Sequence, residues 1–173
     1  ILFVIYLIGY STFLFLSVVV GATTLYKKKM QDRLMNKFTE KYFVPITIVT
    51  PAYNEEVTVV QTVKSLLTLD YKLYEIIVVD DGSKDSTSQQ LIDAYNMHPV
   101  RRPLHRSIDC QPVEFIYESH EQKVPLTLIR KKNGGKADAL NMGINAAQYP
   151  YFICMDADSV LQYDSLKKLV VPV

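Results

Sequence analysis

The sequence predicts an α/β domain built on a parallel sheet with helices on both faces, preceded by one transmembrane helix. Short apolar runs alternate with longer stretches in which apolar residues recur at helical spacing, and this alternation is typical of such sheets. The first 26 of the 173 residues carry no charged side chain, and about 20 apolar residues suffice to span a bilayer. Polar residues gather where several predicted strands end, which is where ligands bind in sheets of this class.

The N-terminal segment, residues 1–26, is predicted to be a transmembrane helix. The apolar part of a signal peptide would be shorter, roughly 7 to 15 residues. Three lysines follow at positions 27–29, and positive charge beside a membrane segment favours the cytoplasmic side. We therefore expect a protein of the cell membrane whose following domain is cytoplasmic. Residues 27–44, with Leu34 and Phe38 at helical spacing, fit either an amphipathic connector at the membrane surface or a plain linker helix.

The remaining residues, 45–173, are expected to form the α/β domain. Strands are indicated by short apolar runs, and helices by apolar residues three or four apart behind polar starts. The first half should contain a strand at 46–49 that ends at Thr50 and Pro51, a helix at 55–69 with acidic residues in its first turn, a strand at 75–79 and a helix capped by residues 85–87. The second half should contain a strand at 126–129, a helix that buries Ala137, Leu140, Ile144 and Ala147, and a buried strand at 151–155.

The stretch from 98 to 125 interrupts the alternation and is predicted to be a surface insertion. It contains four prolines and all three histidines, with a possible edge strand at 113–117. The histidines lack regular ligand spacing, which disfavours a metal site there. Cys110 lies in this polar stretch and Cys154 in a strand expected to be buried, so the two cysteines indicate reduced cytosolic thiols and not a disulfide framework.

Two carboxylates, Asp156 and Asp158, follow the last predicted strand with one small residue between them. Alternate residues of an extended segment point the same way, so both can face one ligand. Hard oxygen donors suit Mg²⁺ or Mn²⁺, which usually bind one or two carboxylates together with substrate phosphates. The pair therefore indicates a metal-held diphosphate, although a solvated turn with an Asx hydrogen bond is the commoner explanation of an isolated Asp-x-Asp.

Similar clusters follow the other strands, and together they suit one nucleotide ligand. Tyr53 could stack on a base, Asp81 could accept from a base N–H, and Glu55 could accept from ribose hydroxyls. The Gly134-Gly135 pair would let backbone approach phosphates, and Lys136, at a helix N-terminus, would add a positive charge. Each cluster alone could be a turn or a helix start.

Two classes of function are disfavoured by the same residues. The stretch Asn133-Gly134-Gly135-Lys136 lacks the glycine spacing and the following Ser or Thr of a Walker loop, which argues against a kinase or ATPase. The net charge is +1, and apart from residues 27–29 the basic residues are scattered. Nucleic acid is therefore not expected as a partner.

Four ordered motifs resemble those of family 2 glycosyltransferases, and within that family the membrane-embedded processive synthases of cellulose, chitin, hyaluronan and poly-N-acetylglucosamine. They are Pro51-Ala52-Tyr53-Asn54-Glu55-Glu56, Val79-Asp80-Asp81-Gly82-Ser83 with Asp85-Ser86-Thr87, Gly134-Gly135-Lys136-Ala137-Asp138-Ala139-Leu140-Asn141, and Asp156-Ala157-Asp158. The resemblance runs from about residue 45 to the end. It implies a Rossmann-like GT-A fold, a nucleotide-sugar donor that is usually UDP-linked, a saccharide or lipid acceptor, and a divalent metal, Mn²⁺ or Mg²⁺.

The resemblance also implies roles for individual residues. Tyr53, Glu55 and Asp81 would hold the nucleoside, Lys136 the diphosphate, and Asp156 and Asp158 the ribose, diphosphate and metal. Asp80 and Asp138 match family positions with less defined roles. The expected donor-binding set is Pro51, Ala52, Tyr53, Glu55, Asp80, Asp81, Gly135, Lys136, Asp138 and Asp156, and the expected metal ligands are Asp156 and Asp158.

The family's catalytic carboxylate, acceptor site and Gln-x-x-Arg-Trp motif come later in the chain, and this sequence contains no Trp. We therefore expect the amino-terminal, donor-binding part of an inverting glycosyltransferase, with no catalytic base of its own and no activity alone. A lipid-linked monosaccharide transferase of the same family is an alternative, disfavoured because such enzymes more often carry their membrane helices after the catalytic domain. A non-catalytic, membrane-tethered nucleotide-binding module is another, and nothing in these residues excludes it.

Overall fold

The computed structural model describes residues 2–41, 43–105 and 107–170, and within helix α1 it describes the side chains of residues 3–30. The chain divides into two compact units, Ile1–Tyr42 and Phe43–Val173. The first is helix α1 (Leu2–Lys41), which continues beyond the predicted end of the membrane segment at residue 26. Its stretch Phe3–Met30 is long and apolar enough to cross a membrane. The predicted amphipathic side chains of the connector lie outside the described ones.

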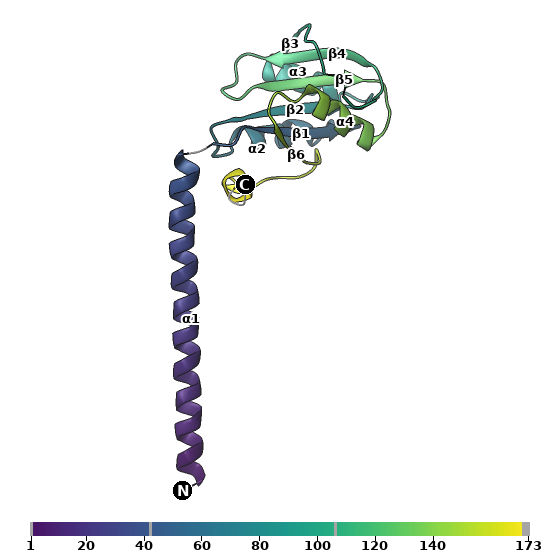
Figure 1. Ribbon diagram of the computed structural model, residues 1–173. Coiled ribbons are helices and arrows are strands. Elements are labelled where there is room, and N and C mark those ends of the chain that lie inside the picture. Colours follow the sequence, from purple (N-terminus) through teal and green to yellow (C-terminus); the bar gives the residue numbers. More distant parts are fainter. Residues whose placement is uncertain (1, 42, 106, 171–173) are drawn as a thin grey trace. The chain divides into compact units, whose positions relative to one another are not determined.

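The second unit is built on a six-stranded sheet in the order β3-β4-β5-β2-β1-β6 (Figure 1). Its strands are β1 (Ile46–Ala52), β2 (Tyr74–Asp80), β3 (His98–Pro99), β4 (Val113–Ser119), β5 (Leu126–Lys131) and β6 (Tyr151–Cys154). β5, β2, β1 and β6 are parallel, whereas β4 runs antiparallel to β5 and β3 antiparallel to β4. The sheet is therefore mixed, and the wholly parallel sheet predicted from the alternation is wrong at this edge.

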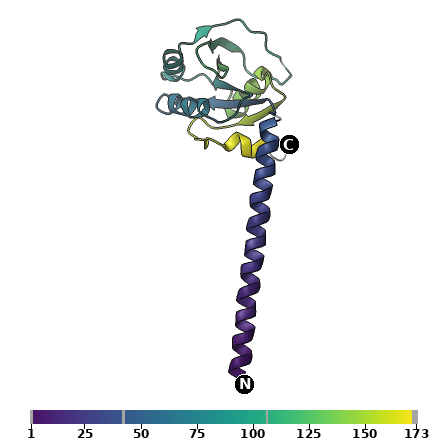
Figure 2. The ribbon, with the colours of Figure 1, turned by 90° about the vertical axis from the view of Figure 1, so that its left-hand side faces the viewer.

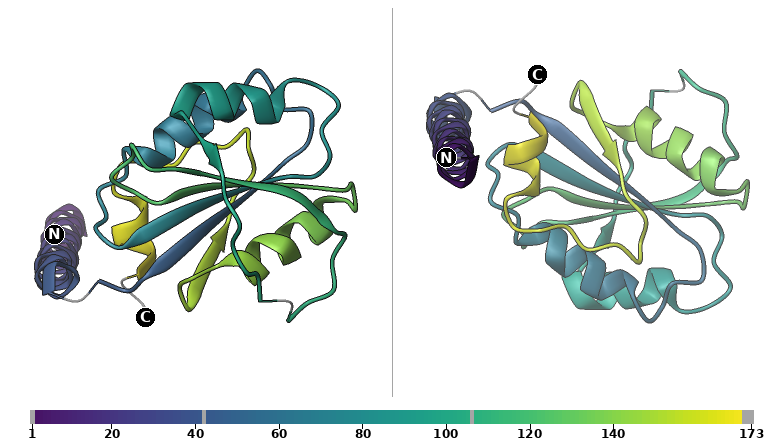
Figure 3. Two further views of the ribbon diagram at one scale, coloured as in Figure 1. Left: turned by 90° about the horizontal axis from the view of Figure 1, so that it is seen from above. Right: turned by 90° about the horizontal axis from the view of Figure 1, so that it is seen from below.

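Helices cover both faces of the sheet, as predicted. α2 (Val59–Leu67), α3 (Thr87–Tyr95) and α5 (Ser165–Val170) lie on one face, and α4 (Lys136–Ala146) covers the other (Figures 2 and 3). Neighbouring residues of β1 serve the two cores: Ile48 packs with the α2 face and Val49 with the α4 face, both fully buried. β1 and β2 are buried along their whole length, as expected for strands covered on both faces.

The buried side of α4 differs from the predicted one. Ala137 is exposed and Leu140 and Ile144 are only half-buried, whereas Met142 and Gly143 are buried. A Cβ atom on Gly143 would lie 2.1 Å from Cγ1 of Val49. The helix therefore approaches the sheet through its small residues, because that close contact has no room for larger side chains.

The helix predicted at 55–69 begins at Val59, and its first turn contains no acidic residue. Asn54 has a positive φ of 56°, which is incompatible with an α-helix. The backbone N–H groups of Asn54 and Glu55 donate to the hydroxyls of Ser83 (3.0 Å) and Thr87 (2.8 Å). Asn54 and Glu55 are thus held by Ser83 in the loop after β2 and by Thr87 at the start of α3, and do not extend α2.

β6 is an exposed edge strand, although the sequence predicts a buried one. Among the described residues it pairs with β1 alone. Tyr151 and Phe152 are each 48% exposed, and Cys154 is a free, exposed cysteine, so the predicted burial of its thiol is wrong. Apolar composition marks this run as a strand but cannot show whether a second neighbour covers it.

The segment 98–125 is more than the predicted surface insertion, because β3 and β4 within it extend the sheet. The possible strand at 113–117 is confirmed and extends to Ser119, with β3 pairing outside it. The intervening loop is bound to α4: Asn145 accepts from the N–H of Ile108 (3.0 Å), and Arg102 donates to the carbonyl of Ala146 (2.6 Å).

Candidate donor-binding site

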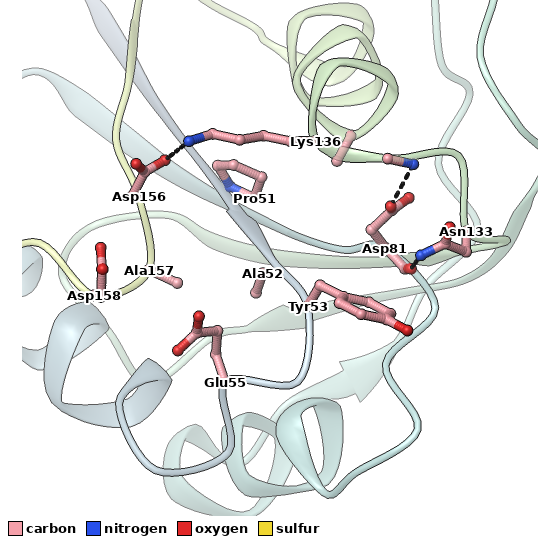
Figure 4. A pocket seen from close by; sticks show the side chains of 12 residues that line it. Pro51, Ala52, Tyr53, Glu55, Asp81, Asn133, Lys136, Asp156, Ala157 and Asp158 are labelled. Carbon is pink, nitrogen blue, oxygen red and sulfur yellow. Dashed lines mark hydrogen bonds and ion pairs between the residues drawn. The ribbon is translucent and has the colours of Figure 1, made fainter.

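A cleft of about 450 Å³ lies at the carboxyl ends of β1, β2 and β6 and the start of α4 (Figure 4). Its volume is typical of small-molecule sites. The lining residues are Pro51, Ala52, Tyr53, Glu55, Asp81, Asn133, Gly135, Lys136, Ala139, Asp156, Ala157 and Asp158. Nine of the eleven residues predicted to bind the donor or metal are in this set. Asp80 and Asp138 are not.

Asp81 is the most buried acidic residue of the lining, with a side chain 4% exposed. Its Oδ1 accepts from the N–H of Gly134 (3.0 Å) and from the ammonium group of Lys131, and its Oδ2 accepts from the N–H of Gly135 (2.7 Å). Asn133 also donates to the carbonyl oxygen of Asp81 (2.8 Å). Asp81 therefore holds the loop between β5 and α4 against the end of β2. Figure 4 shows Asp81 and Asn133, a residue of that loop, beside the ring of Tyr53.

Lys136 and Asp156 form an ion pair across the cleft, with 2.6 Å between Nζ and Oδ1 (Figure 4). Both side chains are largely in solvent, 63% and 50% exposed. Such an exposed pair contributes only about 0.2–1 kcal/mol to stability. The pair can therefore be opened by a ligand at little cost.

The Asp-Ala-Asp segment after β6 alternates as predicted. Met155 and Ala157 are buried in the core on the α2 face, whereas Asp156 and Asp158 are exposed. The hydroxyl of Thr62 donates to the carbonyl of Ala157, which fixes the middle of the segment. Both carboxylates are thus available to one ligand in the cleft, and Glu55 extends toward the same space (Figure 4).

The exposed carboxylates of the cleft fit a divalent ion that obtains most of its ligands from substrate phosphates and water. Among the described residues no three His, Cys, Asp or Glu side chains are grouped closely enough to hold a metal alone. Mg²⁺ and Mn²⁺ prefer oxygen ligands, and Mg²⁺ commonly binds one or two carboxylates with substrate phosphates and water. Asp156 and Asp158 supply that number, so the site fits a metal only together with a diphosphate.

Asp80 and Asp138, predicted among the donor-binding residues, do not line the cleft and have partners within the chain. Asp80 is 1% exposed, and its carboxylate accepts from the N–H of Ser83 (2.8 Å) and the hydroxyl of Ser88. Asp138 pairs with Lys131, 2.6 Å between Oδ2 and Nζ. Partial burial alone would raise the pKa of Asp138, but hydrogen bonds from Lys131 and from the N–H of Gln111 hold that pKa below its ordinary value of 3.8.

Four residues at or next to the cleft were not assigned there from the sequence. Asn133, Ala139 and Ala157 line it, and Lys131 lies behind Asp81 with its side chain fully buried. One signal was available for Lys131: it is two residues from the buried Ile129, so strand alternation places it on the inner, α4-facing side of β5.

A mixed sheet covered by helices on both faces, with a polar cleft at the carboxyl ends of its parallel strands, is the GT-A-like arrangement of glycosyltransferases. Solved structures agree on this fold. A mannosyltransferase from Pyrobaculum calidifontis, in complex with GDP-Man and Mn²⁺, superposes with a TM-score of 0.59 at 24% identity, over 75% of this chain and 32% of its own. A fragment of Staphylococcus aureus TarS in complex with UDP-GlcNAc gives a TM-score of 0.53 at 21% identity, over 73% of this chain and 30% of its own.

The chain belongs to glycosyl transferase family 2, whose family model matches residues 47–108 and 111–173. It is similar to a poly-beta-1,6-N-acetyl-D-glucosamine synthase from Staphylococcus aureus (strain COL), 29% identical over 163 residues that cover 92% of this chain. The synthase of the same name from Staphylococcus epidermidis is 30% identical over the same length. The chain spans about a third, 34%, of the length of these relatives.

Proposed function

We propose that this chain is the donor-binding part of a membrane-anchored, inverting glycosyltransferase that transfers a sugar from a UDP-sugar to a growing polysaccharide. One observation carries the proposal: a single cleft at the strand ends brings together an aromatic ring, buried and exposed carboxylates, and a lysine at a helix N-terminus. Among the described residues no three His, Cys, Asp or Glu side chains could hold a metal ion by themselves, so the proposed metal would depend on the bound diphosphate for further ligands.

The nucleoside would occupy the side of the cleft formed by β1 and β2. The ring of Tyr53, 45% exposed, offers a flat surface on which a base can stack. Oδ2 of Asp81 accepts one N–H within the described protein, that of Gly135, and retains capacity for a second donor such as the N3–H of uracil. Glu55, fixed by a hydrogen bond from Thr58 (2.6 Å), is placed to accept from ribose hydroxyls.

The diphosphate would lie between the start of α4 and the Asp-Ala-Asp segment. Lys136 is the first residue of α4, so its charge adds to the positive end of the helix dipole. Gly135 has a φ of 90° and no atom within 4 Å of the position of a Cβ. Its N–H donates to Asp81, so the glycine would contribute space for phosphate oxygens and not a hydrogen bond. Asp156 and Asp158 would hold Mn²⁺ or Mg²⁺, which neutralises charge on the departing diphosphate when bound.

The remaining parts of the proposal come from the wider chain. The named relatives are polysaccharide synthases, which favours a polymer over a single lipid-linked sugar as product. The 28-residue apolar stretch Phe3–Met30 would anchor the enzyme, and Lys27–Lys29 would place its catalytic domain in the cytoplasm. The base that deprotonates the acceptor hydroxyl would come from a later part of the enzyme, because the family motif for it lies beyond these four.

The proposal is tested by calorimetric titration of UDP into the detergent-solubilised chain with and without Mn²⁺. We expect Mn²⁺ to tighten UDP binding, and Asp158→Asn to remove that gain while leaving metal-free UDP binding within about twofold. Asp164→Asn, an exposed carboxylate that does not line the cleft, is the matched control and should behave as wild type. Folded wild-type chain that binds no UDP in either condition, or equal losses for Asp158→Asn with and without Mn²⁺, would refute the assignment.

A further inference from the structure

Lys131 is a buried charged residue that the proposed reaction does not use. It is the last residue of β5, and its side chain is 0% exposed. The ammonium group contacts Oδ1 of Asp81, Oδ2 of Asp138 (2.6 Å) and the carbonyl of Lys132 (2.8 Å). Three acceptors match its three N–H donors, so the group is fully satisfied without solvent. A buried lysine is costly unless it is paired in this way.

The two carboxylates that Lys131 joins come from different elements around the cleft. Asp81 follows β2, and Asp138 lies in the first turn of α4. Asp138 also accepts from the N–H of Gln111 (3.1 Å), in the loop that precedes β4. Lys131 therefore connects the end of β2, the start of α4 and the 98–125 segment at one buried point, directly behind the loop at 133–135.

The contact with Lys131 also determines how Asp81 can use its two oxygens. Oδ1 accepts from both Lys131 and the N–H of Gly134, which fills its two lone pairs. Oδ2 accepts from Gly135 alone among the described residues. Because Lys131 and Gly134 occupy Oδ1 of Asp81, Oδ2 is the oxygen that can receive a further hydrogen bond in the cleft.

We propose that Lys131 is a positioning residue for base recognition: its ammonium group fixes the rotamer of Asp81 and the 133–135 loop so that Asp81 presents Oδ2 to the base. The proposal rests on the function proposed above, in which Asp81 meets a uracil N3–H. Cytosine carries an acceptor at N3 and no hydrogen, so a fixed carboxylate should prefer UDP over CDP. A carboxylate freed to rotate should lose much of that preference.

The test uses a variant that keeps the charge balance of the buried group. Lys131→Met alone would leave two carboxylates without a cation, which endangers folding. Lys131→Met combined with Asp138→Asn removes one positive and one negative charge, so that only the N–H groups of Gly134 and Gly135 still hold the Asp81 carboxylate and no buried cation fixes its orientation. The matched control is Lys168→Met with Asp164→Asn, the same double change at an exposed ion pair outside the cleft.

Two readouts are measured on the whole detergent-solubilised chain. The first is the ratio of the CDP and UDP dissociation constants, which we expect to fall about tenfold or more in the Lys131 variant and to stay constant in the control, since one charge-assisted hydrogen bond is at stake. The second needs no ligand: amide hydrogen exchange at Gly134 and Gly135 should accelerate about tenfold or more, because these N–H groups donate to Asp81.

The outcomes separate this inference from the proposed function. If wild type does not prefer UDP over CDP, the uridine assignment fails, and exchange at Gly134 and Gly135 still decides whether Lys131 positions the loop. If wild type prefers UDP and the Lys131 variant keeps that preference, or keeps the exchange protection, the inference is overturned. Should the double variant not fold, Lys131→Gln combined with Asp138→Asn replaces it. The glutamine amide at position 131 is shorter than the lysine but can still donate toward Asp81. The same two readouts are then measured, with smaller expected changes.

Discussion

Replacing Lys136 by alanine should weaken UDP binding about tenfold and leave uridine binding unchanged. A positive charge about 4 Å from a phosphate charge gains about 1 kcal/mol in water and about 4 kcal/mol near a protein surface. Because Lys136 is 63% exposed, a value near the lower end, about 2 kcal/mol, is appropriate. Binding must first break the pair with Asp156, which costs about 0.5 kcal/mol. The net difference of about 1.5 kcal/mol corresponds to roughly a tenfold change in affinity.

The assay is calorimetric titration of UDP and of uridine into wild type, Lys136→Ala and Lys132→Ala. Lys132 is an exposed lysine four positions earlier that does not line the cleft, so its removal controls for general loss of positive charge. Uridine has no phosphates, and its affinity should stay within about twofold in both variants. Equal weakening of UDP and uridine by Lys136→Ala would show that the lysine supports the site as a whole and would refute the diphosphate assignment.

Three further predictions concern one residue of the cleft and two residues that stabilise the surrounding fold. Tyr53→Ala should weaken uridine and UDP to the same extent, about tenfold or more by calorimetry, because stacking is worth about 1–3 kcal/mol per base; Tyr53→Phe should bind as wild type. Gly143→Ala should lower the free energy of unfolding by about 1–3 kcal/mol in urea denaturation, because its Cβ would meet Val49 at 2.1 Å. Adding Val49→Ala should recover part of that loss, and additive losses would contradict the packing argument. Asp85→Ala should cost about 1 kcal/mol at pH 7, since the carboxylate accepts from the N–H and hydroxyl of Thr87 (3.0 and 2.5 Å). Those hydrogen bonds outweigh desolvation and lower the pKa of Asp85 below 3.8, so its contribution is complete above about pH 4 and is lost as the pH falls through the lower folded value. A wild-type-to-variant difference that does not shrink as the pH is lowered below 4 would contradict this.

The location of the cleft could be predicted because it depends on two simple facts. Strands of β-favouring residues are recognisable by their apolar runs, and in parallel sheets their carboxyl ends meet at one edge. Tyr53, Asp81, Lys136 and Asp156 each follow such a run or begin the next helix, so their gathering follows from the order of elements alone. The family motifs name the same positions.

The features that the sequence did not predict depend on contacts between distant segments. β6 reads as a buried strand, yet whether an apolar strand lies at an edge is decided by the presence of a second neighbour. The buried side of α4 was misplaced because close packing through Gly143 against Val49 outweighs the apolar stripe that the helix carries. Lys131 was overlooked because lysines are rarely buried, and only its pairing with two aspartates makes burial possible.

The charges of the cleft explain why donor and metal binding should favour each other. Lys136 and Asp156 neutralise one another in the cleft, so under the proposed function a metal alone would compete with the lysine for Asp156, and a diphosphate alone would compete with the aspartate for Lys136. In the proposed function, Lys136 would turn to the diphosphate when both ligands bind, and Asp156 would then join Asp158 as a metal ligand. Each ligand would thus remove the competitor of the other, and by linkage any gain in UDP affinity from Mn²⁺ would equal the gain in Mn²⁺ affinity from UDP. The exposed Lys136–Asp156 pair contributes little to stability, and under the proposed function its chief consequence would be this coupling.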